Sequence, residues 1–304
     1  MPKRAPICID GVKVAAAVRR ELQQEIAELR AQGIVPGLAV VLVGTNPASQ
    51  VYVRNKRKVC AELGIVSYDI DLPETTTESA LLKRIEKLNA DPKVHGILIQ
   101  LPLPKHINEE RILYAVAPEK DVDGFHPLNV GRLLLGKPYF VPCTPAGCIE
   151  LLKRYKISTE GKHVVIVGRS NIVGKPLAAW LMQKGADANA TVTVCHSRTR
   201  NLSRFTQSAD ILVAAMGVPE FIQGRMVREG VVVLDVGINS VPDPTRASGR
   251  RLVGDVAYAG VARKARAITP VPGGVGPMTI AMLMRNTVLA ARRLSPQGSK
   301  NAKR

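Results

Sequence analysis

The sequence predicts an α/β protein of two domains, each built on a mostly parallel sheet. Apolar runs of strand length alternate with stretches of helical periodicity along the chain. One such run, in the stretch that begins at Lys162, ends in Gly168 and is followed by Gly174 and a helix-like segment, 177–184. This is the opening expected of a dinucleotide-binding βαβ unit, and the alternative is an ordinary tight strand-to-helix turn. The 304 residues are enough for two domains of ordinary size, each with its own core.

The composition is that of a globular protein with an anionic partner. Hydrophobic residues make up 46% of the chain and charged residues 22%, which excludes a disordered chain. A net charge of +18 suits a polyphosphate or polycarboxylate small molecule, or a nucleic acid. Aromatic residues, at 4%, are too scarce for stacking on single strands, and most of the basic residues are dispersed.

Cysteine and histidine usage predicts a reduced, cytoplasmic chain without a metal site. The five cysteines form no C-x-x-C pair and the five histidines are scattered, so no zinc spacing is present. There is no apolar leader and no uninterrupted apolar segment of membrane-spanning length, so we expect neither export nor membrane insertion. The basic segment 295–304 is expected to be a disordered tail.

The first half of the chain alternates helices and strands. The hydrophobic pattern predicts helices over 12–31, 48–63 and 77–88, and strands over 38–43, 67–72 and 96–100. In such a sheet the ligand crevice lies at the carboxyl ends of the strands, and the residues that follow two of these strands carry chemistry. Ser49, Tyr52 and Lys56 share one face of the helix after the first strand, and Gln100 and two prolines follow the third.

A further loop, 120–127, places Asp121 and Asp123 ahead of a tight turn. Alternatives stay open for each of these residues. Lys56 lies in a basic run that could be a solvated helix face, and Gln100 could satisfy backbone groups of the sheet. Either aspartate could cap a turn.

A break at 139–145 marks the domain boundary. Thr144 is expected to be the N-cap of a helix that runs to about residue 156, with Pro145 at its first position. The following pattern predicts a dinucleotide unit whose first strand ends in Gly168, with further strands 191–195, 211–215 and 231–236 and helices 177–184 and 201–208. A loop rich in glycine and proline, 269–279, precedes a last helix, 280–293.

The cofactor of this unit is predicted to be NADP. An NAD site usually has a carboxylate after its second strand, to bind the ribose 2′-hydroxyl. Here Ser197, Arg198 and Arg200 occupy that stretch, and Arg169 lies in the first loop. Hydroxyl and guanidinium groups suit a 2′-phosphate, although these arginines could also be plain surface charge.

Six motifs, in order, carry a resemblance to a known family. They are Tyr52-x-x-x-Lys56, Gln100-Leu-Pro-Leu-Pro104, Lys120-Asp-Val-Asp-Gly-Phe-His126, Pro142-Cys-Thr-Pro145, Gly168-Arg-Ser-x-Ile-Val-Gly-x-Pro176 and Pro272-Gly-Gly-Val-Gly-Pro-Met-Thr279. Together they closely resemble the bifunctional methylenetetrahydrofolate dehydrogenase/methenyltetrahydrofolate cyclohydrolase family over residues 7–292.

The resemblance implies a fold and an activity. It implies an N-terminal α/β catalytic domain, residues 1–142 with the last helix at about 280–294, and a Rossmann-like NADP-binding domain, residues 143–279, with the active-site cleft between them. Methylenetetrahydrofolate would be oxidised with NADP, and the methenyl product hydrolysed to formyltetrahydrofolate, in one-carbon metabolism and purine biosynthesis. A cytoplasmic homodimer is implied too, with no nucleic-acid or membrane partner.

The same resemblance implies roles for individual residues. Lys56 would be the general acid/base, with Gln100 as its hydrogen-bond partner. Tyr52 would line the folate and Asp123 would anchor the pterin. Further folate contacts would be Pro272 and Gly273, and the cofactor contacts would be Gly168, Arg169, Ser170, Ser197 and Ile238.

A lysine takes a proton from water only if its pKa is lowered, and we expect either loss of water or like charge from Arg54, Arg57 and Lys58 to lower it.

Two other functions share some features of this sequence. One is a short-chain dehydrogenase that uses Tyr52 and Lys56, but there the nucleotide loop precedes the pair. The other is a basic nucleic-acid-binding protein, for which no recognition motif is present.

Overall fold

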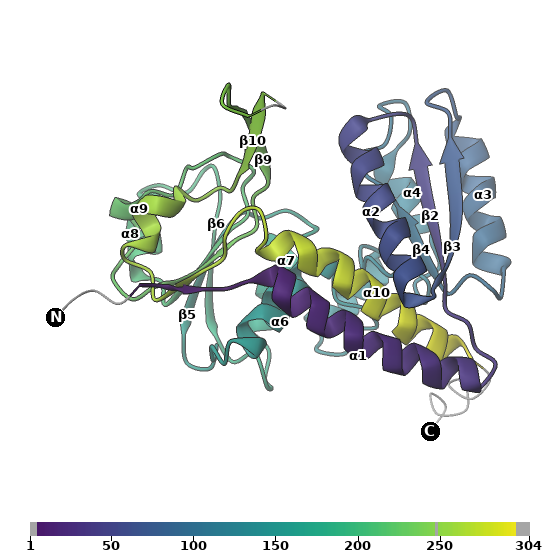
Figure 1. The fold of residues 1–304 in the computed structure, drawn as a ribbon, viewed down its shortest axis with the longest axis horizontal. Helices are drawn as coiled ribbons and strands as arrows, with labels where there is room; N and C mark the ends of the chain where they lie inside the picture. The colour runs from purple at the N-terminus through teal and green to yellow at the C-terminus, as the bar shows by residue number, and fades with distance from the viewer. Residues whose placement is uncertain (1–4, 247–248, 296–304) are drawn as a thin grey trace. The chain divides into compact units, whose positions relative to one another are not determined.

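The computed structural model describes residues 5–246 and 249–295, and these divide into two compact units. The six-stranded unit comprises residues 5–16 and 144–279, and the three-stranded unit comprises residues 17–143 and 280–295. Figure 1 labels most of their elements. All but one residue of the predicted tail, 295–304, lies outside the described residues.

The three-stranded unit is built on a parallel sheet in the order β3-β2-β4 (Figure 1). Its strands are β2 (Gly37–Val43), β3 (Val66–Leu72) and β4 (Gly96–Ile99). All seven residues of β2 are buried, as expected for an apolar run covered on both faces of a parallel sheet. On one face, alternate β2 residues pack with helices α3 (Glu78–Ala90) and α4 (Glu109–Ala115), through Leu81, Ile85 and Ile112 among others.

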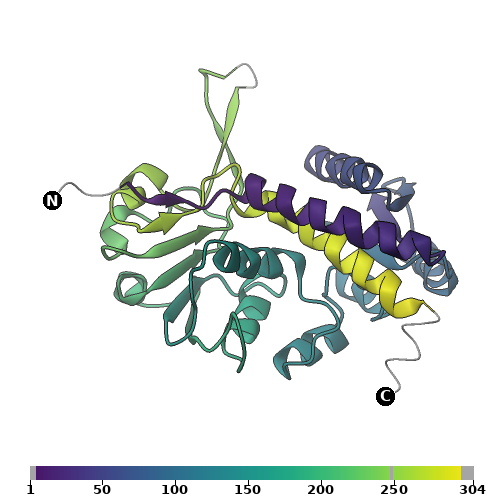
Figure 2. The same ribbon diagram turned by 60° about the horizontal axis from the view of Figure 1, so that its bottom comes forward.

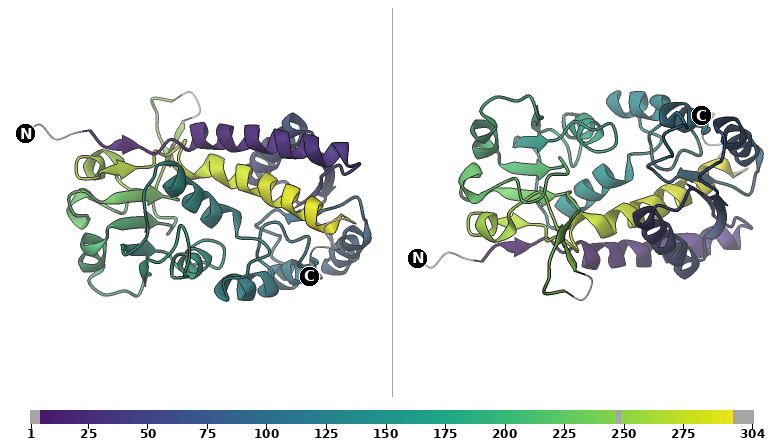
Figure 3. Two further views of the ribbon diagram at one scale, coloured as in Figure 1. Left: turned by 90° about the horizontal axis from the view of Figure 1, so that it is seen from below. Right: turned by 90° about the horizontal axis from the view of Figure 1, so that it is seen from above.

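Two long helices contribute to this unit. These are α1 (Gly11–Ala31) and α10 (Val275–Leu294), which lie side by side along the unit in Figures 1, 2 and 3. Arg292 forms an ion pair with Glu25 across them at 2.9 Å. Helix α2 (Pro47–Leu63) follows β2, and the short helix α5 (Pro127–Leu134) follows the aspartate loop.

A bridge outside the regular strands positions that loop. Ile97 of β4 pairs in parallel with Asp121, and the Ile97 amide donates to the Lys120 carbonyl oxygen at 2.7 Å. The chain from Asp121 onward therefore runs beside β4 in the same direction. This register brings Asp123 to the carboxyl edge of the sheet, where Gln100 follows β4.

The six-stranded unit has a fully parallel sheet in the order β1-β11-β8-β7-β5-β6. Its strands are β1 (Ile7–Cys8), β5 (His163–Val167), β6 (Thr191–Cys195), β7 (Ile211–Ala214), β8 (Val232–Asp235) and β11 (Ala267–Ile268). Its helices are α6 (Cys143–Arg154), α7 (Gly174–Leu181), α8 (Leu202–Ser208), α9 (Tyr258–Ala262) and the 3₁₀ turn η1 (Gly224–Met226). A hairpin of β9 (Asn239–Pro242) and β10 (Arg250–Val253) extends from this unit (Figure 2).

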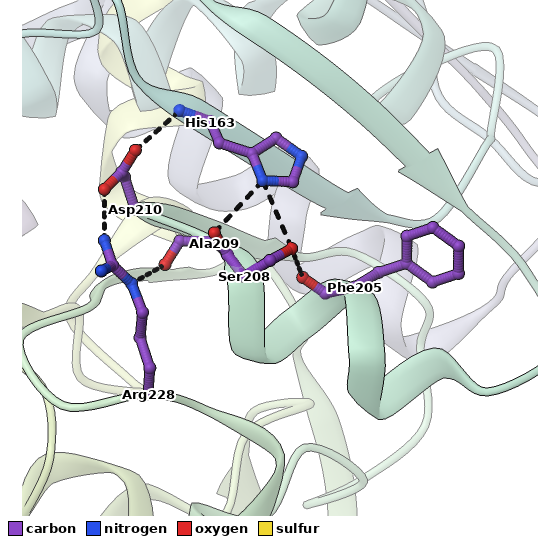
Figure 4. A network of polar contacts seen from close by, with 6 residues as sticks. All are labelled: His163, Phe205, Ser208, Ala209, Asp210 and Arg228. Atoms are coloured by element: carbon purple, nitrogen blue, oxygen red, sulfur yellow. Dashed lines mark hydrogen bonds and ion pairs between the residues drawn. The ribbon is translucent and has the colours of Figure 1, made fainter.

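A network of hydrogen bonds and an ion pair around Asp210 stabilises the amino edge of this sheet (Figure 4). The Asp210 carboxylate accepts the His163 amide at 2.8 Å and forms an ion pair with Arg228, whose Nε donates to the Ala209 carbonyl oxygen. The His163 ring contacts the Ser208 carbonyl oxygen at 3.2 Å. Strand β5 is thereby tied to α8 and β7 at the end opposite Gly168.

Several boundaries differ from the sequence predictions. The N-terminal segment was predicted to belong with residues up to 142, but β1 pairs with β11 and residues 5–16 group with the six-stranded unit. Helix α6 begins at Cys143, so Thr144 is helical and not the N-cap, and its hydroxyl lies 3.1 Å from the Thr279 hydroxyl. The final helix begins at Val275, five residues before the predicted start, because Pro277 fits in a first turn whose N–H groups have no helical acceptor.

Helices α4, α5 and α9 and the β9–β10 hairpin were not predicted; each is short or carries a weak periodic pattern. Within the described ranges the five cysteines are free, and no group of three or more His, Cys, Asp or Glu side chains could hold a metal ion. No helix in the same ranges has the length and apolarity needed to cross a membrane.

Candidate active site

A buried lysine and a glutamine meet at the carboxyl edge of the three-stranded sheet. Lys56, on α2, is only 8% exposed, and its Nζ donates to Gln100 Oε1 at 3.0 Å. The Gln100 Nε2 donates to the Leu101 carbonyl oxygen at 2.7 Å, which fixes the amide with its oxygen toward the lysine. The structure therefore brings together the predicted pair and excludes a solvated face for Lys56. The Leu101–Pro102 bond that follows is cis.

Loss of water, and not like charge, lowers the pKa of Lys56. Burial disfavours the ammonium form and moves its pKa below the usual range, while Asp123 acts in the opposite direction. The expected contribution of Arg54, Arg57 and Lys58 is wrong: Arg57 forms ion pairs with Asp69 and Asp71, and none of the three basic residues is among the causes of the shift.

Asp123 is electrostatically coupled to this lysine. Burial raises the pKa of the Asp123 carboxyl to about 6, although the Lys56 charge lowers it. The Cys143 thiol donates to Asp123 Oδ1 at 3.5 Å, and burial raises the pKa of that thiol well above its ordinary value. Lys56 and Asp123 thus form an ionisable pair in a poorly hydrated site, where each influences the charge of the other.

Two asparagines that the sequence did not single out, Asn286 and Asn129, hold the aspartate loop. Asn286, on α10, donates through Nδ2 to the carbonyl oxygens of Val122 at 2.8 Å and Val141 at 3.1 Å. Asp121 acts as a turn cap, one of the two readings left open, because its carboxylate accepts the His126 amide and the Asn129 side chain, each at 2.8 Å. Both residues are buried, and no sequence motif distinguishes an asparagine such as Asn286.

Tyr52 lies one turn before Lys56 on α2. Its side chain is 42% exposed, so the ring is available to a ligand, whereas Ser49 on the preceding turn is buried. On the predicted common face of α2, Ser49 and Lys56 are therefore buried, and Tyr52 between them is exposed. Pro272 and Gly273 belong to the other unit, where the Gly273 carbonyl oxygen accepts the amides of Gly11 and Val12 at the start of α1.

The strand order of the six-stranded sheet reverses at β5, between β6 and β7. In open α/β sheets such a switch point, at the carboxyl ends of the strands, is where ligands bind. Gly168 follows β5 with a φ of +135°, and a Cβ atom on it would lie 2.1 Å from the Ala215 carbonyl oxygen after β7. A Cβ atom on Gly174 would lie 2.1 Å from the Gly168 carbonyl oxygen. Only glycines permit this close loop.

The loop ends at an amino terminus suited to a phosphate. Helix α7 starts at Gly174 and no side chain caps it. The Lys175 amide donates to the Ser170 carbonyl oxygen and Pro176 has no N–H, so the Gly174 amide and the helix dipole are what this end offers to an anion. Ser170 accepts the Val173 amide at 3.1 Å and shapes the turn. Arg169 and Ser170 are exposed beside it, and Ser197 is exposed after β6. The residues present therefore fit a dinucleotide carrying an additional phosphate.

Comparison with known proteins identifies the chain. The family model for the catalytic domain of tetrahydrofolate dehydrogenase/cyclohydrolase matches residues 9–123, and that for its NAD(P)-binding domain matches residues 142–295. The bifunctional protein FolD of Moorella thermoacetica is 58% identical over 285 residues, which cover 94% of this chain and 98% of that protein.

Solved structures agree. The bifunctional FolD methylenetetrahydrofolate dehydrogenase/cyclohydrolase of Campylobacter jejuni superposes with a TM-score of 0.90 at 50% identity, covering 95% of this chain and 99% of that one. The Trypanosoma brucei enzyme, complexed with NADP cofactor and an inhibitor, has the same TM-score at 40% identity and covers 95% and 98% of the two chains.

These matches confirm the predicted family and its two-domain α/β fold, and they support neither a short-chain dehydrogenase nor a nucleic-acid-binding protein. The NAD(P)-binding domain agrees with the predicted nucleotide cofactor. The chain belongs to the tetrahydrofolate dehydrogenase/cyclohydrolase family, as a bifunctional enzyme of one-carbon metabolism.

Proposed function

We propose that this chain oxidises 5,10-methylenetetrahydrofolate with NADP and hydrolyses the methenyl product to 10-formyltetrahydrofolate, with Lys56 as the general acid/base. The observation that carries the proposal is the bond from the buried Lys56 ammonium to Gln100, beside Asp123. A lysine that burial brings toward neutrality can exchange a proton with water, which a solvated lysine does poorly near pH 7.

The oxidation needs alignment more than proton transfer. NADP supplies the hydride acceptor when it is bound. The carbon that gives up the hydride becomes a cation stabilised by its two flanking nitrogens, so no acid or base is needed at that step. The contribution of the chain is to hold the folate in position, and orientation alone lowers such a barrier by roughly 7–11 kcal/mol at best.

The hydrolysis needs Lys56. Water attacks the methenyl carbon, a C–O bond forms, and neutral Lys56 takes the proton that the water loses. The C–N bond to N5 then breaks with its electron pair going to N5, and the same lysine returns a proton to that nitrogen. The hydroxyl group that came from the water loses its remaining proton to the solvent as it becomes the formyl C=O, so one proton is released overall. Gln100 keeps Nζ in place through its amide oxygen, and its second bond to Leu101 prevents the amide from turning away. General acid–base catalysis of this kind contributes about 10²–10⁴-fold.

Asp123 is proposed as the anchor of the pterin, with Tyr52 as a ring surface for the folate. An ionised carboxylate matches the amino and ring N–H donors of a pterin through a charge-assisted pair. Tyr52 is exposed enough to take part. Pro272 and Gly273 are proposed as further folate contacts, on the resemblance alone.

The dinucleotide is proposed to bind the six-stranded unit. Gly168 and Ser170 would receive the pyrophosphate at the start of α7, and Ile238, which is 43% exposed, would contact the cofactor. Arg169 and Ser197 would bind the 2′-phosphate, since no carboxylate stands after β6 to select NAD.

The setting of the enzyme is also a proposal. We infer a cytoplasmic homodimer that supplies formyl groups for purine biosynthesis, with no nucleic-acid or membrane partner. The net charge of +18 supports an anionic substrate that carries glutamate carboxylates.

The experiment is to replace Lys56 with methionine, which keeps most of the apolar stem. In one cuvette, NADPH and methenyltetrahydrofolate absorbances report the two reactions separately. Lys56→Met should lower cyclohydrolase turnover by at least about 10²-fold while the NADP dissociation constant stays unchanged. Lys58→Met, an exposed lysine on the same helix, is the control and should retain both activities. Full hydrolysis by Lys56→Met would show that the general base lies elsewhere.

A further inference from the structure

Two buried carboxylates lie at the carboxyl edge of the six-stranded sheet. Asp235 ends β8 and is 4% exposed, and Asp255 follows β10 and is fully buried. Neither forms one of the ion pairs identified among the described residues. Buried carboxylates are costly unless hydrogen bonds compensate them, so their partners indicate what they hold in place.

Asp255 connects the loops that follow β7 and β8. Its Oδ2 accepts the backbone amides of Met216 at 2.7 Å and Gly217 at 2.9 Å, directly after β7. Its Oδ1 accepts from Asn239 Nδ2 at 2.9 Å, after β8. One side chain therefore sets the distance between two loops that are separate in the sequence.

Asp235 completes the arrangement with three further backbone donors. Its Oδ1 accepts the amides of Gly237 at 3.0 Å and Asp255 at 2.9 Å, and its Oδ2 accepts that of Val256 at 3.0 Å. Its own amide donates to the Thr269 hydroxyl at 2.7 Å, where the glycine-rich loop begins after β11. The two aspartates together thus join the connections that follow β7, β8, β10 and β11.

Glycines keep the backbone close to both carboxylates. A Cβ atom on Gly254 would lie 1.8 Å from Asp235 Oδ2, and one on Gly237 would lie 2.2 Å from Asp255 Oδ1. Neither glycine tolerates a side chain without displacing a carboxylate. The backbone at Gly237 and Gly254 therefore follows a path that only glycine allows, close against the two carboxylates.

Ile238 lies between two residues that these acids hold. Its neighbour Gly237 donates to Asp235, and its other neighbour Asn239 donates to Asp255, while Ile238 itself is exposed. We propose that Asp255, supported by Asp235, is a positioning residue for the dinucleotide, because it sets the places of Ile238 and of the Met216–Gly217 backbone beside the switch point. This proposal rests on the proposed cofactor position.

The role makes a distinct prediction for cofactor binding. Removal of the Asp255 carboxylate leaves two backbone amides and Asn239 without their acceptor, so the loops after β7 and β8 lose their common support. Hydrolysis of methenyltetrahydrofolate requires no hydride acceptor and uses Lys56 of the three-stranded unit. A positioning defect should therefore affect NADP affinity and spare the cyclohydrolase.

The test compares Asp255→Ala and Asp255→Asn with Asp210→Asn as the control. Asp210 also stabilises this sheet, but at its amino edge (Figure 4). Calorimetric titration should show an NADP dissociation constant raised about tenfold in Asp255→Ala and about threefold in Asp255→Asn, which keeps one acceptor oxygen. Cyclohydrolase kcat and KM should stay within about twofold of wild type in both. Asp210→Asn should lower the melting temperature without changing NADP affinity.

Unchanged NADP affinity in both Asp255 variants would overturn the positioning role, as would a parallel loss of the two activities. Ser197→Glu tests the proposed cofactor position independently of Asp255, so the two proposals can be rejected separately. Weaker NADP binding in Ser197→Glu beside unchanged binding in Asp255→Ala rejects the positioning role alone. Unchanged binding in all these variants rejects the cofactor position together with the role of Asp255.

Discussion

The Asp123 carboxyl, the proposed pterin anchor, is expected to lower the unfolding free energy of the protein when it ionises. Burial raises its pKa from 3.8 to about 6, so the folded protein holds the proton more tightly than the unfolded chain. Stability is then lost as pH rises through the interval between these values, and the loss is complete above pH 6. The difference corresponds to about 3 kcal/mol of unfolding free energy, of which about half has been lost by pH 5.

Asp123→Asn removes this titration and keeps the shape of the side chain. The variant should therefore gain stability relative to wild type as pH rises, by roughly 1–1.5 kcal/mol between pH 5 and pH 8. It should also lose folate affinity, since a neutral amide cannot form the charge-assisted pair, and KM should rise roughly tenfold or more.

Urea unfolding followed by circular dichroism at pH 5, 6, 7 and 8 measures the stability of both proteins. Glu119→Gln, which neutralises an exposed carboxylate of the same unit, is the control and should leave the pH profile of wild type unchanged. If the stability difference between Asp123→Asn and wild type stays constant or shrinks toward pH 8, burial does not raise the carboxyl pKa and the reasoning is refuted.

Three further changes test other parts of the structure. Gln100→Leu removes the acceptor of Lys56 and should lower cyclohydrolase kcat roughly tenfold, with unchanged NADP affinity; equal turnover in steady-state assays would dismiss the orienting role. Ser197→Glu should raise the NADP dissociation constant at least about tenfold and increase the affinity for NAD relative to that for NADP. Thr191→Glu, at the other end of β6, is the control and should change neither quantity. The folded-state pKa of Asp210 is lowered, so its carboxylate stabilises the fold at pH values above the unfolded pKa of 3.8, and this contribution is lost as pH falls through the folded pKa. Asp210→Asn should therefore lower the melting temperature at pH 7 and much less at about pH 2; an equal loss at both pH values would contradict this.

Local patterns were sufficient for most of the strands and long helices. The apolar runs that became β2, β5 and β8 are continuous because helices or loops cover both faces of a parallel sheet. The Gly168 loop was also predictable, since only glycine tolerates the close approach found there. Short elements such as α4 and the β9–β10 hairpin escaped, because a few residues carry too little periodicity to be distinguished from loops.

The motifs also determined the family, and with it the choice of Lys56, Gln100 and Asp123. The sequence could not say why Lys56 would lose its proton. Like charge from its basic neighbours was a reasonable expectation, but ion pairs occupy Arg57, and burial by residues distant in the chain lowers the lysine pKa instead. Hydration is a property of the packed structure, and nearest neighbours in sequence do not report it.

The sequence by itself thus determined the strands, the glycine loop and the family, and with the family the choice of the proposed reacting residues, because these depend on side-chain type and local spacing. Only the tertiary structure decided which groups meet. The bridge from Ile97 to Asp121 brings Asp123 beside β4, Asn286 reaches Val122 across more than 160 positions, and β1 joins the sheet of the other unit. Such contacts are set by backbone pairing and packing between distant segments, for which local periodicity carries no signal.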